Sequence, residues 1–177
     1  MVRRLGAGEA RERVAELSAV LIDCVEGGAS VSFMAPLTRE RADAFWRRVA
    51  DGVASGDRLL LVAEDQSSGE IVGTVQLVFA IPENQSHRAD VAKMLVRRSA
   101  RKHGLGARLL RGAEAAALAA GKTLLVLDTV TGGDAERLYQ RMGWTRVGVV
   151  PDYALWPDGR LCDTTFFYKR LNPMPLG

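Results

Sequence analysis

The feature that most constrains this sequence is the order in which strand-type and helix-type apolar patterns follow one another. They predict a strand (2–5), two helices (about 10–25 and 38–53), three strands (58–63, 71–80 and 90–96), a helix (104–120), a strand (124–129), a helix (134–142) and two strands (144–150 and 161–168). Such a series packs as a mixed sheet with helices on its faces, in the α/β (α+β) class. The patterns continue without a linker or repeat, so we expect one domain over residues 1–177.

The first predicted helix has apolar residues at steps of three and four, from Ala10 to Val25. Gly27 and Gly28 should end it. Thr38 can cap the second helix, because a threonine hydroxyl can accept a hydrogen bond from a backbone N–H of the first turn.

Composition and charge exclude several classes of protein. The chain of 177 residues is 47% hydrophobic and 25% charged, which is typical of a globular domain. No apolar run approaches the roughly 20 residues of a membrane span, and no signal peptide is apparent, so we expect a cytoplasmic protein without a membrane partner. The net charge of +3 is too small to support a nucleic-acid partner. Two cysteines and two histidines without ligand spacing predict no metal site.

The sharpest local signal is the basic, glycine-containing segment Arg101-Lys102-His103-Gly104-Leu105-Gly106, between a predicted strand and a predicted helix. The N–H groups of the first helical turn and the helix dipole would form a site for a pyrophosphate or similar anion. From the segment alone, a loop that merely uses glycine to turn is an equal alternative. It lacks the third glycine of a dinucleotide-binding motif, and neither a P-loop nor a Gly-x-Ser-x-Gly elbow is found.

Two motifs in this order and separation resemble those of the GNAT superfamily of acyl-CoA N-acyltransferases. Residues 90–110 resemble its acyl-CoA motif, Arg/Gln-x-x-Gly-x-Gly/Ala, and residues 135–144 resemble its second motif, Ala-x-x-Leu/Phe-Tyr-x-x-x-Gly-Phe/Trp. The element order is similar over about residues 1–170. The resemblance implies a central mixed, mostly antiparallel twisted sheet flanked by about four helices, with acetyl-CoA as cosubstrate.

Further segments (27–34, 127–129, 145–148 and 157–161) resemble tabtoxin-resistance acetyltransferases, which acetylate the amino group of a β-lactam-containing amino acid. One departure concerns Gly132, which stands where many GNAT members carry an Asn that contacts the pantetheine arm. The backbone of Gly132 and Gly133 is a candidate substitute for that contact.

The resemblance assigns the cofactor roles. The phosphates would bind Arg101, Lys102, His103, Gly104, Leu105 and Gly106. The backbone of Met94, Leu95 and Val96 would line the pantetheine and polarise the thioester, while their side chains belong to the core.

Acetyl transfer also needs a base for an amine whose pKa is near 10.4 and an acid for the departing thiolate. Asp128 interrupts an apolar strand and Asp90 opens another, so both are candidates for the base. Backbone capping by Asp128 and a solvated strand end at Asp90 are the alternatives. The resemblance places Tyr139 beside the CoA sulfur as the acid; without it, a core aromatic residue would be the preferred interpretation.

The acceptor pocket is predicted between residues 29–37 and 151–160, and its candidate lining residues are Ser30, Ser32, Phe33, Met34, Asp152 and Tyr153. Asp152 or Asp90 is expected to attract the substrate ammonium. Packing is the alternative for Phe33 and Met34.

The sequence therefore predicts an N-acetyltransferase that acts on a small amino-acid-like molecule, such as a toxin or antibiotic. Two alternatives stay open: an enzyme that acetylates a protein N-terminus or lysine, and a non-catalytic acyl-CoA sensor. The strand around residues 71–80 and the last strand are candidates for pairing in a homodimer. The sequence does not decide the oligomeric state.

Overall fold

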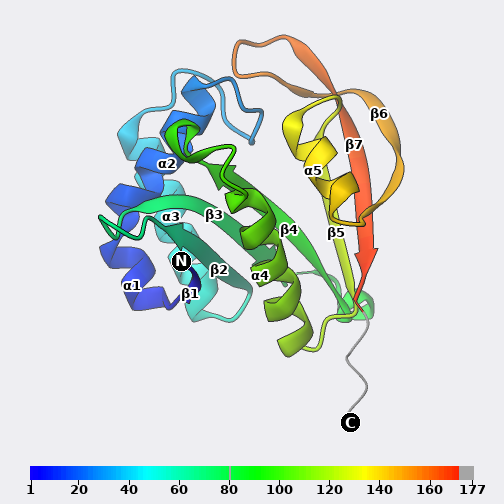
Figure 1. Cartoon of the computed structure of the whole chain (residues 1–177), viewed down its shortest axis with the longest axis horizontal. Coiled ribbons are helices and arrows are strands. Elements are labelled where there is room, and N and C mark those ends of the chain that lie inside the picture. Colours follow the sequence, from blue (N-terminus) through cyan, green and yellow to red (C-terminus); the bar gives the residue numbers. More distant parts are fainter. Residues whose placement is uncertain (80, 172–177) are drawn as a thin grey trace.

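The computed structural model describes residues 1–79 and 81–171, so the predicted end of a strand at Ala80 lies outside the described residues. Within them, seven strands form one sheet in the order β1-β2-β3-β4-β5-β7-β6 (Figure 1). The strands are β1 (Val2–Leu5), β2 (Arg58–Glu64), β3 (Ile71–Val78), β4 (Arg88–Val96), β5 (Leu124–Val130), β6 (Thr145–Leu155) and β7 (Leu161–Arg170). Only β4 and β5 pair in parallel, which confirms a mixed, mostly antiparallel sheet.

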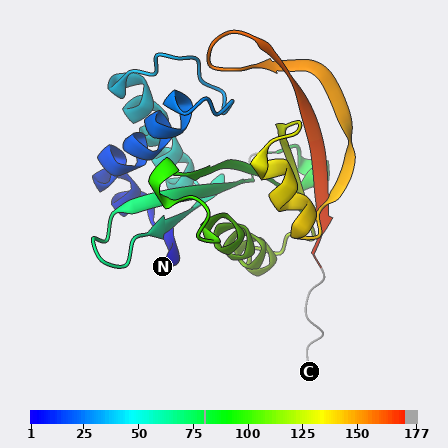
Figure 2. The same cartoon turned by 45° about the horizontal axis from the view of Figure 1, so that its top comes forward.

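In the part of the chain that the structure describes, five α-helices cover the two faces of this sheet (Figure 2). They are α1 (Ala7–Glu12), α2 (Val14–Glu26), α3 (Arg39–Ala54), α4 (Leu105–Ala119) and α5 (Asp134–Arg141). One core cluster joins α1, α2 and α3 to side chains such as Leu60 and Leu95. A second joins α4 and α5 to the opposite face, around Leu61 and Phe167. The alternation of side chains along each strand supplies both faces with apolar groups.

The single helix predicted over residues 10–25 is wrong, because the chain forms two helices that meet at Arg13. Arg13 has φ −100° and ψ 18°, and its guanidinium pairs with Glu16 and Glu64. The apolar stripe continues through both helices, so its periodicity does not reveal the break. The cap on α3 is confirmed, since Arg41 N–H donates to Thr38 Oγ1 at 3.4 Å.

The parallel pair in the middle of the sheet opens toward its carboxyl end. Residues Arg88–Asp90 of β4 pair with Leu124–Val126 of β5, and no later residues of the two strands pair with each other within the described chain. From Val91 and Leu127 onward, β4 follows β3 and β5 follows β7. The sheet thus contains an opening between β4 and β5.

The β6–β7 hairpin and the loop between α2 and α3 approach each other (Figure 2). Ser30 Oγ donates to the Leu155 carbonyl at 2.7 Å, and Ala35 N–H donates to the Pro157 carbonyl at 3.0 Å. β6 continues to Leu155, beyond the predicted end at residue 150, through two irregularities in its pairing with β7. In the described residues, no helix combines the length and the apolar character needed to cross a membrane.

Candidate active site

The loop between β4 and α4 presents a run of unpaired backbone donors. Gly104 adopts φ +70° immediately before α4, and no side chain caps this helix. Among the described residues, none accepts a hydrogen bond from the N–H groups of residues 102–107. These donors and the positive end of the 15-residue helix form a cradle for an anion.

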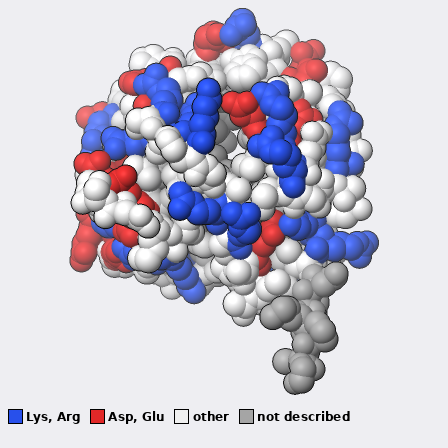
Figure 3. Space-filling model, in the orientation of Figure 1, with Lys and Arg blue, Asp and Glu red and all other residues white. Residues whose placement is uncertain are grey.

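The side chains of this anion loop (residues 101–106) have different roles. Arg101 Nε donates to the Val96 carbonyl at 3.1 Å, while Lys102 and His103 are exposed. Leu105 is buried, so it can offer a ligand only its backbone. A Cβ on Gly106 would lie 3.0 Å from Leu138 Cδ2, so this glycine also permits α4 and α5 to pack closely. Basic side chains surround a hollow over this region (Figure 3).

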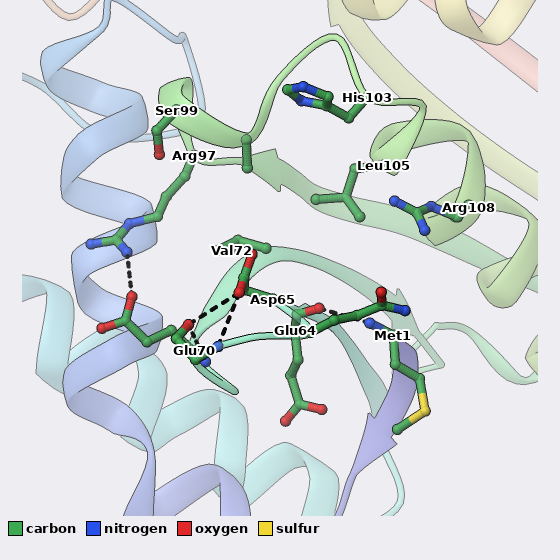
Figure 4. A pocket seen from close by; sticks show the side chains of 13 residues that line it. Met1, Glu64, Asp65, Glu70, Val72, Arg97, Ser99, His103, Leu105 and Arg108 are labelled. Carbon is green, nitrogen blue, oxygen red and sulfur yellow. Dashed lines mark hydrogen bonds and ion pairs between the residues drawn. The ribbon is translucent and has the colours of Figure 1, made fainter.

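A cavity of about 470 Å³ adjoins the anion loop on the side of the β2–β3 hairpin (Figure 4). Arg97 in its wall pairs with Glu70 at 3.4 Å. His103 and Arg108 lie on the α4 side, and Arg108 has no ion-pair partner within the described chain. The lining also includes Glu64, Asp65 and Glu70, so the cavity carries both charges, and only its α4 side continues the basic surface of the loop.

Met94, Leu95 and Val96 lie on β4 beside the opening. Leu95 is buried and pairs with Thr74, and Met94 and Val96 pack against the second core cluster. These side chains belong to the core, as the sequence predicts. Their place on the diverging part of β4 leaves their backbone next to the opening.

A second cavity, of about 660 Å³, lies where β4 and β5 begin to diverge. Its lining includes Asp90, Ala92, Val126, Asp128 and Phe166, so the structure brings both predicted carboxylates together. We call it the acceptor cavity. Asp90 forms an ion pair with Arg88, which also lines it.

Asp128 is the carboxylate without a paired cation. It is open to solvent within the cavity, yet desolvation by the surrounding protein raises its pKa above the ordinary aspartate value. Lys93 opposes this shift and Asp90 adds to it. A carboxylate with a raised pKa is a better proton acceptor, as a general base requires.

Tyr139 lies on α5, only 4% exposed, and packs against Trp144 and Phe167. Burial raises the pKa of its phenol, and the negative charge of Asp128 raises it further. The phenol therefore stays protonated at neutral pH, and the raised pKa makes it a weaker proton donor than an ordinary tyrosine unless the thiolate that accepts the proton is desolvated as well. The packing of the ring supports the core interpretation. Tyr139 is in the lining of neither cavity, so its link to the site is the electrostatic influence of Asp128 on its phenol.

Lys93 is a candidate site residue that the sequence analysis missed. It lines neither cavity itself, but its neighbour Ala92 and its electrostatic partner Asp128 line the acceptor cavity. It sits at an irregularity in the β3–β4 pairing with φ +48°, and its Nζ lies 3.0 Å from Ser32 Oγ and 5.7 Å from the centre of the Phe45 ring. Burial lowers its pKa, and Asp128 partly restores it. Lys93 is the one charged residue in the apolar run 91–96, a signal like the one that identified Asp128.

The predicted acceptor residues separate into three groups. Tyr153 stacks edge-on at 5.4 Å against Phe166, which lines the acceptor cavity, but Tyr153 itself is not in the lining. Ser32 contacts Lys93, and Phe33 packs edge-on against Phe45 at 5.3 Å. In the third group, Ser30 bonds to the hairpin, Met34 is 38% exposed, and Asp152 N–H donates to Asp163. None of the six predicted acceptor residues is in the lining of the acceptor cavity.

The backbone of Gly132 is already engaged within the protein. Its N–H donates to Glu136, and its carbonyl accepts from Arg137 at 2.8 Å. This glycine is therefore poorly suited to replace the missing Asn. Within the described residues, no cluster of three or more His, Cys, Asp or Glu residues could hold a metal ion.

Residues 56–146 match the family described as the acetyltransferase (GNAT) domain. An uncharacterized N-acetyltransferase from Azospirillum brasilense is 34% identical over 108 residues, which cover 60% of this chain and 61% of that protein. The match thus spans less than two thirds of this curated relative.

Two solved structures share the fold. An N-acetyltransferase from Staphylococcus aureus Mu50 has a TM-score of 0.79 at 20% identity, covering 97% of this chain and 98% of that one. A phosphinothricin acetyltransferase from Sinorhizobium meliloti in complex with acetyl-CoA has a TM-score of 0.80 at 17% identity, covering 97% and 88%. The family match covers more than half of the chain, and the protein therefore belongs to the GNAT acetyltransferase family.

Proposed function

We propose that this protein transfers acetyl from acetyl-CoA to the amino group of a small amino-acid-like molecule. The observation that carries this proposal is the placement of two complementary sites along one strand. The unpaired N–H groups of residues 102–107 follow the end of β4, while Asp90 and Asp128 line a cavity where β4 and β5 begin to diverge. The first suits an anionic donor and the second suits an amine.

The donor would bind with its pyrophosphate on the anion loop. Arg101, Lys102 and His103 would add positive charge, and the N–H groups of Gly104, Leu105 and Gly106 would donate hydrogen bonds. The pantetheine arm would then follow the backbone of residues 94–96 into the opening. A backbone N–H there would stabilise the oxyanion that develops on the thioester carbonyl.

The reaction would proceed by direct attack. The bound ammonium first loses one proton to water, and the neutral amine nitrogen then forms a C–N bond to the carbonyl carbon while the C–S bond breaks. The proton leaving the amine goes to Asp128, directly or through a water, while the thiolate takes a proton from Tyr139. The products are the N-acetylated acceptor and free CoA, and solvent exchange restores both side chains.

A small acceptor is supported by the acceptor cavity, whose 660 Å³ lies in the usual range for small-molecule sites. A tabtoxin-type β-lactam amino acid or a related antibiotic is the proposed substrate, which would give the enzyme a resistance role. Asp128 would attract its ammonium, and Asp90 would contribute less because it is paired with Arg88. Protein acetylation and non-catalytic CoA sensing remain outcomes of the test below.

The setting of the enzyme is also a proposal. The continuous sheet supports one catalytic domain over residues 1–177, and the two free, buried cysteines are compatible with a reducing cytoplasm. The two strands that the sequence suggested for pairing in a homodimer, β3 and β7, both lie inside the sheet, so that suggestion is wrong. Exposed apolar side chains on edge strand β6, such as Val147 and Val150, support pairing in a homodimer instead. Sedimentation measurements would test that pairing.

Thiol release from acetyl-CoA tests the proposed function. The purified protein should release CoA in the presence of some members of a panel of small amines that includes a tabtoxin-type β-lactam amino acid. Release that requires this compound would support the resistance role. Acetyl-CoA binding without release from any small amine would contradict the proposal and favour a protein acceptor or a sensor.

A further inference from the structure

Lys93 occupies an unusual position for a surface lysine. The irregular pairing between β3 and β4 gives its backbone a positive φ, and Thr74 Oγ1 donates to its carbonyl at 2.9 Å. The side chain extends toward the α2–α3 loop and α3, where it reaches Ser32 Oγ and the ring of Phe45. The local fold thus directs this ammonium to the face of the sheet that carries Asp128.

The ammonium of Lys93 has no ion-pair partner in the described part of the chain. Its electrostatic neighbours are Asp128 on β5 and Arg58 on β2, while Ser32 and Phe45 supply uncharged contacts. A half-buried cation without a paired anion is costly, because the protein replaces only part of its hydration. A ligand that brings an anion to this position would remove that cost.

Gln76 gives a second indication, because it places another hydrogen-bond donor without a partner close to Lys93. It pairs with Ala92, the neighbour of Lys93, and is 1% exposed. Its Oε1 accepts from Arg58, but its Nε2 donates to no described group. Buried amide donors normally have partners, so an acceptor oxygen or a bridging water is expected there.

We propose that Lys93 is a specificity-determining residue that binds an acidic group, such as a carboxylate, on the acetyl acceptor. This inference rests on the proposed function and deepens it, because it defines the acceptor as an amine that also carries an acid. The ammonium of the acceptor would lie at the Asp128 carboxylate, and its acidic group would lie at the Lys93 ammonium. Each charge of the zwitterionic acceptor would thus face a side chain of opposite charge. A simple amine would leave Lys93 without its anion and would bind more weakly.

The test compares amino acids with their carboxamides, which keep the amine and side chain but remove the negative charge. Lys93→Met should lower the acid-to-amide ratio of kcat/KM by roughly 10- to 100-fold, mainly through the KM of the acid, and leave acetyl-CoA binding unchanged. Lys93→Arg should keep the preference. Lys122 is a matched control, since its Nζ also bonds to an oxygen, at 2.7 Å, and lies over a Phe ring. Lys122→Met should leave the ratio unchanged.

Two outcomes would overturn the inference: no acid preference in the unmodified enzyme, or an unchanged acid-to-amide ratio in Lys93→Met, whether or not both activities fall. If no panel amine is acetylated, the proposed function fails separately. Calorimetry with N-acetyl amino acids and their amides then tests the inference. It requires that Lys93→Met bind the acids more weakly than the unmodified protein does, and the amides equally well.

Discussion

Lys93 Nζ lies 3.0 Å from Ser32 Oγ, and the backbones of both residues have positive φ, 48° and 73°. Among the described residues, the other non-glycine residues with positive φ are Lys102 in the anion loop and Asp152 in the β6–β7 hairpin. Each costs about 1–2 kcal/mol relative to an ordinary conformation. All four belong to segments that surround the opening, which is where strained backbone is expected if the opening is functional.

The affinity for a carboxylate-bearing acceptor should fall as pH rises. This fall should begin at a lower pH than the one at which an ordinary lysine loses its charge. Burial lowers the pKa of Lys93, Arg58 lowers it further, and Asp128 only partly compensates. As pH rises through this lowered pKa, the cation disappears and the KM should rise. KM measured from neutral to alkaline pH should show the rise in the unmodified enzyme and not in Lys93→Arg, because a guanidinium stays charged. The same rise in both proteins would exclude titration of Lys93 as its cause.

Asp128→Asn should lower kcat by roughly 100-fold or more, the usual contribution of a general base. Desolvation raises the pKa of Asp128. As pH falls, this carboxylate therefore takes up its proton, and stops acting as a base, at a higher pH than an ordinary aspartate does. The kcat profile should therefore have an acidic limb that the variant lacks. Asp90→Asn is the matched control: Arg88 already neutralises this carboxylate, so kcat should fall less than about tenfold. A larger loss in Asp90→Asn would reverse the two roles.

Much of this fold can be predicted from apolar periodicity, because each strand and helix presents a continuous apolar face to one of the two core clusters. The errors arise where distant residues intervene. The break at Arg13 depends on Glu64, which follows it by 51 positions. The extension of β6 to Leu155 depends on pairing with β7 across irregularities around Pro151 and Asp152. Neither interaction has a local sequence signal.

The candidate site was also predictable from the sequence only in part. Asp128 could be predicted because a carboxylate inside an apolar strand requires an explanation, and Asp90 lines the same cavity. Lys93 breaks its strand in the same way, but a lysine in a strand is usually solvated, so the charge alone does not distinguish the two cases. Asp152 was favoured for its charge, yet its N–H bonds to Asp163 and its side chain lies outside the cavity.

Gly104→Ala should weaken acetyl-CoA binding by roughly tenfold, because a side chain disfavours the φ of +70° that turns the loop and exposes its N–H groups. Gly121 is a matched control, since it has φ +72° and equally open space around it. Both alanine variants should lose about 1 kcal/mol of stability. Calorimetry should find weaker acetyl-CoA binding only in Gly104→Ala. Equal affinities for the two variants would show that the loop merely turns the chain.

Glu64→Gln should lower the free energy of unfolding by about 1–3 kcal/mol, because Glu64 joins the guanidinium groups of Arg3 and Arg13. These hydrogen bonds hold the pKa of Glu64 at about 2, below its ordinary value of 4.5. The stabilisation is therefore present above pH 4.5 and is lost as pH falls toward 2. Urea unfolding should show the variant approaching the unmodified protein over this range. Glu12→Gln, an exposed site without an ion pair in the described chain, should have no comparable effect.

Tyr139→Phe should lower kcat by roughly 100-fold or more while changing acetyl-CoA affinity less than threefold, because it removes only a proton donor. The ring packing against Trp144 and Phe167 is preserved, so the unfolding free energy should change little. Tyr168→Phe is the control, since it removes the same hydroxyl from a residue of β7 that has no proposed catalytic role. Single-turnover measurement of CoA release separates chemistry from product dissociation. If Tyr139→Phe and Tyr168→Phe release CoA equally fast, the thiolate takes its proton elsewhere and Tyr139 is a core residue alone.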